Sequence, residues 1–246
     1  MSEISTLSRA KISDLAKLKQ KKYRKQSARL ILEGQRLMGQ LAIYNIRPLE
    51  LYVTDAGVLK DFGDTPAYQL QSRDLHKICD SEHPPSMAAL YPAPLERRID
   101  FNSALYLDSV SDPGNVGTIF RLAAAFGIGQ ILLSPGSCEV SSPKVVRASL
   151  GAVYHVPFSI MSHEELLALP RQRWYLDMEG ETELFALPQS TESSIYVLGN
   201  EAHGVSDMLK QDPARGLRIE MSSKMESLNV AISAGILCHY LFCRSK

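Results

Sequence analysis

Residues 112–121 place an amide and a guanidinium at a spacing that suits contacts with an oxygen-bearing ligand. Pro113 followed by Gly114 fits the centre of a type II turn, because glycine tolerates the positive φ there. Asn115 then suits the cap of a helix. Arg121 lies about 9 Å further along the helix axis, and its planar fork binds phosphate or carboxylate at two points. A plain helix cap and a plain surface arginine are the alternative interpretations.

Residues 198–205 form a polar loop that two glycines, Gly199 and Gly204, bracket. The loop follows an apolar run that is typical of a buried strand, and glycines there let a ligand approach the backbone closely. His203 has the chemistry of a proton shuttle, although a solvent-facing loop histidine is the simpler interpretation. Any turn can contain glycine, so the loop alone indicates only a candidate ligand site.

Residues 219–231 lead from an apolar run through a polar loop into a long apolar helix. Ser227 has the chemistry of an N-cap for that helix. Asn229 is expected just inside the helix, where asparagine has poor intrinsic propensity and is costly to bury without partners. It is therefore a candidate for the functional site, with bonding to local backbone as the alternative.

The elements that must position these residues alternate between strand and helix from residue 104 onward. The apolar patterns predict strands at 104–110, 128–134, 174–178, 194–198 and 217–221, and helices at 116–126, 143–152 and 228–242. Such alternation predicts an α/β fold with a parallel sheet that carries helices on both faces. Ligands bind such sheets at the carboxyl ends of the strands, and all three polar segments lie there.

The first 95 residues differ in character. A basic helix, a helix at 31–41 and a strand at 51–54 are expected, before Pro84, Pro85, Pro92 and Pro94 punctuate the chain. Prolines that gather between patterned segments indicate a domain boundary. We therefore expect a smaller N-terminal α/β domain at 1–97 and a larger domain at 101–246.

The net charge of zero hides a basic N-terminal arm, because residues 1–30 hold nine basic and two acidic side chains. A basic arm on a neutral protein indicates a polyanionic partner such as nucleic acid, with a solvated charged helix as the alternative. The candidate nucleic-acid contacts in the arm are Lys17, Lys21, Lys22, Arg24 and Lys25.

The composition, with 45% hydrophobic and 22% charged residues, is that of a globular protein. The polar first thirty residues lack the apolar core of a signal peptide, so we expect a cytoplasmic protein. Four cysteines without a C-x-x-C pair indicate reduced thiols and no metal site. The dinucleotide, P-loop and H-E-x-x-H motifs are all missing.

Taken in order, the three polar segments resemble the three signature motifs of the SpoU family of RNA ribose methyltransferases. Asn115, Gly117 and Arg121 match the first motif, residues 198–204 the second and residues 227–231 the third. The resemblance covers about residues 100–246. Three motifs in the same order make it far more specific than any one of them.

Two further segments are similar to the same proteins. Residues 142–152 resemble a family segment that contains Arg147, a candidate RNA contact, and residues 32–36 resemble the RNA-binding domain of many members. Ala202 and Glu220 depart from the pattern, since glycine and proline often stand there. Neither departure removes an expected reacting group.

The resemblance implies a trefoil-knotted domain that binds S-adenosylmethionine and methylates a ribose 2'-hydroxyl, with a homodimer formed through the knotted domain. It implies that Arg121 acts on the 2'-oxygen. The side chains expected to orient Arg121 and the ribose are those of Asn115, Glu201, Ser227 and Asn229. Gly199, Ile219 and Leu228 are expected to contact the cofactor, largely through backbone.

Several alternatives stay open. The substrate is expected to be rRNA, by analogy with two-domain members, although the motifs fit tRNA equally. A base-methylating relative fits the motif residues less well, and a non-catalytic RNA-binding or ribosome-assembly factor would be expected to have lost them. The apolar helix at 228–242 is either a dimer surface or internal core.

Overall fold

The computed structural model describes residues 5–55, 57, 65–81, 86–188, 193–211 and 214–244, and Pro84 and Pro85 lie outside these ranges. The chain divides into two compact units. The first unit combines Met1–Pro94 with Ser141–Gly151, and the second combines Leu95–Val140 with Ala152–Lys246. The segment 141–151 therefore groups with the first unit, whereas the sequence prediction placed it in the second domain, at 101–246.

The first unit holds a five-stranded mixed sheet in the order β1-β4-β3-β5-β2. Its strands are β1 (Ser5–Thr6), β2 (Arg29–Glu33), β3 (Glu50–Val53), β4 (Ala67–Gln69) and β5 (Met87–Pro92). Its helices are α1 (Arg9–Lys17), α2 (Lys21–Ser27), α3 (Gln35–Ile43), α4 (Ser72–Ile78) and α6 (Pro143–Ala148).

The helix predicted at 31–41 is wrong over its first four residues. Ile31 pairs with Leu90 in an antiparallel ladder, so residues 29–33 are strand β2. Gly34 then takes a φ of +99°, which separates the strand from helix α3. A short apolar run looks alike in a buried strand and a buried helix, and the glycine was the signal that divides them.

The second unit holds a seven-stranded sheet in which every pairing is parallel, in the order β10-β12-β9-β11-β6-β7-β8. The strands are β6 (Ser103–Leu107), β7 (Gln130–Leu133), β8 (Phe158–Ile160), β9 (Gln172–Leu176), β10 (Thr182–Glu183), β11 (Ser194–Leu198) and β12 (Arg215–Arg218). This sheet confirms the predicted α/β fold class.

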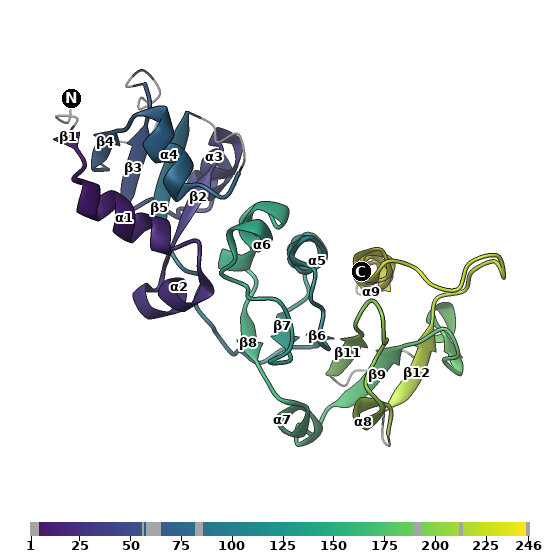
Figure 1. Cartoon of the computed structure of the whole chain (residues 1–246). Helices are drawn as coiled ribbons and strands as arrows, with labels where there is room; N and C mark the ends of the chain where they lie inside the picture. Colours follow the sequence, from purple (N-terminus) through teal and green to yellow (C-terminus); the bar gives the residue numbers. More distant parts are fainter. Residues whose placement is uncertain are drawn as a thin grey trace. The chain divides into compact units, whose positions relative to one another are not determined.

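Helices cover both faces of this sheet. Figure 1 shows α5 (Pro113–Phe126) and α9 (Val230–Arg244) along one face, and α7 (His163–Leu167) and α8 (Asp207–Lys210) along the other. Strand β11 is buried along its whole length, as a central parallel strand should be. The trefoil knot implied by the resemblance is a property of chain threading that strand order does not define, and it stays a prediction.

Two helix starts differ from the sequence prediction. Helix α5 begins at Pro113, and the Asp112 side chain caps it by accepting from the backbone N of Asn115 at 2.8 Å. Pro113 and Gly114 are therefore helical rather than a type II turn, and Asn115 is not the cap. Proline favours the first helical position because its missing N–H is unpaired there in any case.

Helix α9 begins at Val230, so Asn229 lies just before the helix rather than inside it. Its Oδ1 accepts from the backbone N of Ala231 at 2.9 Å and of Ile232 at 3.3 Å. Asn229, and not Ser227, is therefore the capping residue. Within the described part of the chain, no helix is both long enough and apolar enough to cross a membrane.

Candidate active site

A cavity of about 510 Å³ opens at the carboxyl ends of strands β9, β11 and β12, beside the start of α9. Its lining residues come from these four places: Leu176, Asp177, Met178, Leu198, Gly199, Asn200, Glu201, Ala202, Gly204, Leu217, Ile219, Met221, Glu226, Ser227, Leu228, Asn229, Val230 and Ser233. The strand-end position agrees with the rule for parallel sheets. The second and third polar segments of the sequence both contribute to it.

The cavity contains all three residues expected to contact the cofactor, Gly199, Ile219 and Leu228. Gly199 admits no side chain, because a Cβ there would lie 2.2 Å from the backbone carbon of Gly204. Asn200 and Gly204 exchange two backbone hydrogen bonds of 2.9 Å across this narrow turn. The glycine is thus required by the close approach of two backbones, and it leaves the loop's inner edge open to a ligand.

A chain of hydrogen bonds joins the three motif segments at the edge of the cavity. The Nδ2 of Asn115 donates to Oε1 of Glu201 at 2.8 Å, and the Nδ2 of Asn229 donates to Oδ1 of Asn115 at 3.0 Å. Asn115 lies on α5, Glu201 follows β11 and Asn229 precedes α9. These three predicted site residues therefore meet, and Asn229 also bonds to local backbone, which was the alternative interpretation.

The charges on the cavity wall favour a cationic ligand. Asp177, Glu201 and Glu226 line it, and none of the described residues that line it is a lysine, an arginine or a histidine. Leucine, isoleucine, methionine and valine side chains make up most of its apolar part. A ligand with a positive centre and a flat apolar group suits such a surface.

Asp177 lines the cavity but was not among the site residues predicted from the sequence. Its Oδ2 accepts from Nζ of Lys210 on α8 at 2.6 Å. Burial is the largest single cause and raises the pKa of Asp177, but the hydrogen bonds from Lys210 and from the backbone N of Glu179, together with the charge of Lys210, hold it below its ordinary value. Asp177 follows β9 directly, so the same strand-end rule that selected Gly199 also points to it.

Arg121 does not lie with the other predicted site residues. It is on the exposed side of α5, does not line the cavity, and has no hydrogen bond or ion pair with another described residue. Six helical residues place its side chain about 120° around the helix axis from that of Asn115. The expectation that Arg121 and Asn115 face one crevice of the same chain is therefore wrong.

Among the candidate RNA contacts in the basic arm, Lys17, Lys21, Lys22 and Lys25 are exposed. Arg24 is not. It is 6% exposed, and its Nη1 donates to the carbonyls of Leu18 and Lys19 at 2.9 and 2.7 Å. Through these bonds Arg24 joins α2 to the end of α1, so we no longer propose that it contacts RNA.

Arg147 also has an internal partner. Its Nη1 donates to Oε1 of Glu33 at 2.8 Å, and the Glu33 side chain is buried. Both residues belong to the first unit. A buried carboxylate needs such a partner, so this ion pair holds α6 to β2. The Arg147 side chain keeps 30% of its surface exposed, and its contact with RNA stays a prediction.

No group of three or more histidine, cysteine, aspartate or glutamate side chains in the described ranges is arranged to hold a metal ion. The four cysteines, Cys79, Cys138, Cys238 and Cys243, are free.

Two sequence families match the chain. The SpoU rRNA Methylase family matches residues 102–239, and the MRM3-like substrate binding domain matches residues 9–89. The curated relative RlmP of Bacillus subtilis, a 23S rRNA (guanosine(2553)-2'-O)-methyltransferase, is 28% identical over 98% of this chain and 99% of its own length.

Solved structures agree with these matches. A protein of Porphyromonas gingivalis, described as belonging to the TrmH family of RNA methyltransferases, has a TM-score of 0.85 and 33% identity. The match covers 98% of this chain and 100% of that one. An AdoMet-bound rRNA methyltransferase of Sinorhizobium meliloti has a TM-score of 0.80 over 99% of this chain and 98% of that one; at 22% identity it shows a shared fold.

Proposed function

Because the chain belongs to the SpoU rRNA methylase family, we propose that it transfers a methyl group from S-adenosylmethionine to a ribose 2'-hydroxyl of rRNA. The observation that carries the proposal is the assembly of Asn115, Glu201 and Asn229 at the edge of an acidic, apolar-walled cavity. The rRNA activity of RlmP supports the choice of substrate.

The cavity residues fit the donor. S-adenosylmethionine supplies a methyl group activated by a sulfonium, and Glu201 and Glu226 give that cation a favourable field. Gly199, Ile219 and Leu228 would hold it, with Gly199 offering backbone rather than side chain.

The Asn115 amide network would orient the ribose. Its two hydrogen bonds fix the side chain of Asn115, and the network is open to solvent at Glu201 and Asn229. A fixed polar edge beside the donor cavity is what positioning an incoming 2'-hydroxyl requires. Ser227, which also lines the cavity, would add a hydroxyl to the same edge.

Arg121 keeps its proposed role in stabilising the developing 2'-oxyanion or the adjacent phosphate. A guanidinium stays protonated at neutral pH, so charge stabilisation is easier for it than proton abstraction. Arg121 is outside the cavity of its own chain. The role therefore requires substrate binding or a second subunit to bring the guanidinium to the donor.

A homodimer is part of the proposal. An apolar groove of about 590 Å³ runs along α5 and α9, and its lining includes Leu122, Phe126, Phe185, Ile232 and Ile236. Phe185 is 74% and Ile232 55% exposed. Apolar side chains gathered on an exposed face indicate a protein interface, and a second copy that presents the same groove would cover it.

The test is methylation of purified rRNA and tRNA, both taken from cells that lack this gene, with methyl-labelled S-adenosylmethionine. Label in rRNA that yields dinucleotides resistant to alkaline hydrolysis is the expected result, because a 2'-O-methyl group blocks that cleavage. Label in tRNA alone would move the proposal to the tRNA alternative. Label on a base would overturn it.

The non-catalytic alternative, an RNA-binding or assembly factor, predicts binding of RNA without any transfer of label. The assembled motif residues favour the enzyme. The cytoplasmic location stays a prediction.

A further inference from the structure

Asp108 is a buried carboxylate that the proposed reaction does not use. It follows β6 directly and is 2% exposed. Burying a carboxylate is costly unless its oxygens accept hydrogen bonds. Oδ2 accepts from the backbone N of Ser206 at 2.8 Å, and Oδ1 lies 2.8 Å from Nε2 of His163.

These contacts put Asp108 at both ends of the loop at 199–206, which we call the donor loop. The backbone N of Asp108 donates to the carbonyl of Leu198 at 2.8 Å, directly before the loop. Its carboxylate holds the N–H of Ser206 at the other end. Five donor-loop residues line the cavity: Gly199, Asn200, Glu201, Ala202 and Gly204. Asp108 thus closes the base of a loop whose tip forms the cavity wall.

Ser109 extends this hold to the middle of the loop. Its φ of +57° lies in the left-handed region, which non-glycine residues seldom adopt unless their surroundings enforce it. Its backbone N donates to Oγ of Ser134 at 2.8 Å, and its carbonyl accepts from Nδ2 of Asn200 at 2.7 Å. The left-handed conformation of Ser109 therefore accompanies a hydrogen bond between its carbonyl and Asn200 of the donor loop.

His163 connects this arrangement to the opposite face of the sheet. It is the first residue of α7, whose start is fixed by a reciprocal capping interaction between Ser162 and Glu165. The ring of Tyr106 lies against it, with centroids 6.0 Å apart. A fixed imidazole beside the Asp108 carboxylate orients that carboxylate toward Ser206.

We propose that Asp108 and His163 are positioning residues for donor binding: the imidazole holds the carboxylate, and the carboxylate holds the donor loop in its binding shape. The inference rests on the proposed function, because it takes the donor to bind in this cavity. If the hold is released, the loop adopts other shapes, and the apparent Kd rises as the binding-competent fraction falls.

The test compares His163→Asn with His163→Gln in the full chain. Both keep a polar residue at the start of α7, but only the glutamine amide reaches the position of Nε2. Titration calorimetry with S-adenosylmethionine should give a Kd about tenfold higher for the asparagine variant and within about twofold of wild type for glutamine. The KM for the donor should rise with the asparagine variant, while kcat at saturating donor changes less.

Arg171→Leu is the matched control, because it removes an ion pair with Asp100 at the other end of the same strands. It should leave the donor Kd unchanged. A wild-type chain that binds no donor would overturn the proposed function itself. A folded asparagine variant with wild-type affinity, or equal weakening by asparagine and glutamine, overturns only the positioning role. If thermal melts show that the asparagine variant is unfolded, His163→Ser replaces it with the same decision rule.

Discussion

At the scale of single residues, the site depends on amides that serve two partners at once. The Asn229 side chain caps α9 with its oxygen and donates to Asn115 with its nitrogen. The Asn115 side chain passes this orientation on to Glu201. Because each amide end is committed, the position of one residue determines the next, and a substitution that exchanges donor for acceptor should be felt along the whole network.

Asn115→Asp tests this network. It replaces the amide donor by a second carboxylate 2.8 Å from Glu201, and two carboxylates at that distance repel each other. We expect methylation to fall by about 100-fold and to recover in part at acidic pH, where one carboxyl group can protonate. Steady-state rates between pH 5 and 8 measure this.

The control for Asn115→Asp is Asn102→Asp, which makes the same change at an exposed site of the same unit. Its activity should equal that of wild type. Wild-type activity in Asn115→Asp as well would show that the network is dispensable.

Gly199→Ala tests the narrow turn behind the cavity. The added Cβ would lie 2.2 Å from backbone carbon, so the donor loop must shift. We expect donor affinity to fall at least tenfold, since the wall of the cavity moves with the loop. Gly39→Ala in α3 meets open space and should slightly raise the melting temperature by helix propensity alone. Equal donor affinity of Gly199→Ala and wild type, by calorimetry, would contradict the packing argument.

Arg121→Lys tests charge against shape. Lysine keeps the positive charge but loses the planar fork, so we expect kcat to fall by about 100-fold, as for loss of one oxyanion donor. The donor Kd should not change, because Arg121 is outside the cavity. Arg98→Lys at another exposed position is the control. Near-normal kcat in Arg121→Lys would remove this residue from the chemistry.

At the scale of helices and strands, the sequence predicted where elements lie better than where they start. The pattern at 194–198 coincides with β11, because a central parallel strand is an unbroken apolar run. The starts of α5 and α9 were misplaced because several capping residues stand close together, and only the fold selects Asp112 over Asn115 and Asn229 over Ser227.

The basic helix α2 has an exposed side with three lysines and a buried side with Arg24. Lys21, Lys22 and Lys25 are exposed, whereas Arg24 is buried. Changing the three lysines to glutamine should weaken RNA binding and lower the slope of log affinity against log salt by up to about 0.9 per lost phosphate contact. Filter binding at several salt concentrations measures both.

Two comparisons accompany the α2 variant. Arg24→Gln should instead lower the melting temperature, because it removes donors to two carbonyls. Substituting Arg73 and Lys77 on α4 of the same unit by glutamine should leave the salt slope unchanged. An unchanged slope in the lysine variant would exclude α2 from the RNA contact.

At the scale of the whole molecule, the sequence indicated a ligand at the carboxyl edge of the large sheet, and the cavity lies there. Distant segments meet at that edge because parallel strands all end on it, so the meeting of Asn115 with Glu201 and Asn229 was predictable. The direction of Arg121 was not, since it depends on the angle at which α5 lies on the sheet. The ion pair of Arg147 with Glu33 depends likewise on which unit holds residues 141–151.

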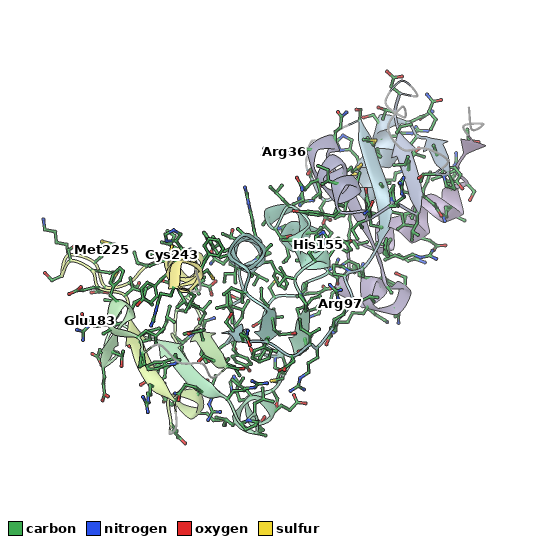
Figure 2. The ribbon with its side chains drawn as sticks, turned by 180° about the vertical axis from the view of Figure 1, so that it is seen from behind. Arg36, Arg97, His155, Glu183, Met225 and Cys243 are labelled. Atoms are coloured by element: carbon green, nitrogen blue, oxygen red, sulfur yellow. The ribbon has the colours of Figure 1, made fainter. Side chains whose placement is uncertain are left out.

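The apolar groove on α5 and α9 makes the oligomeric state testable (Figure 2 shows Cys243, one of its lining residues, near the end of α9). Ile232→Glu places a charge where a second copy would pack, and burying an unpaired charge is prohibitive. We expect wild type to be a dimer and the variant a monomer by light scattering at micromolar concentration. Met208→Glu makes the same change at an exposed residue of α8, on the other face of the sheet, and should remain dimeric.

Because Arg121 and the groove-lining Leu122 are neighbours on α5, the monomeric Ile232→Glu variant should also lose methylation while keeping its donor affinity. A wild type that is active as a monomer, or a monomeric variant with full activity, would show that one chain completes the site alone.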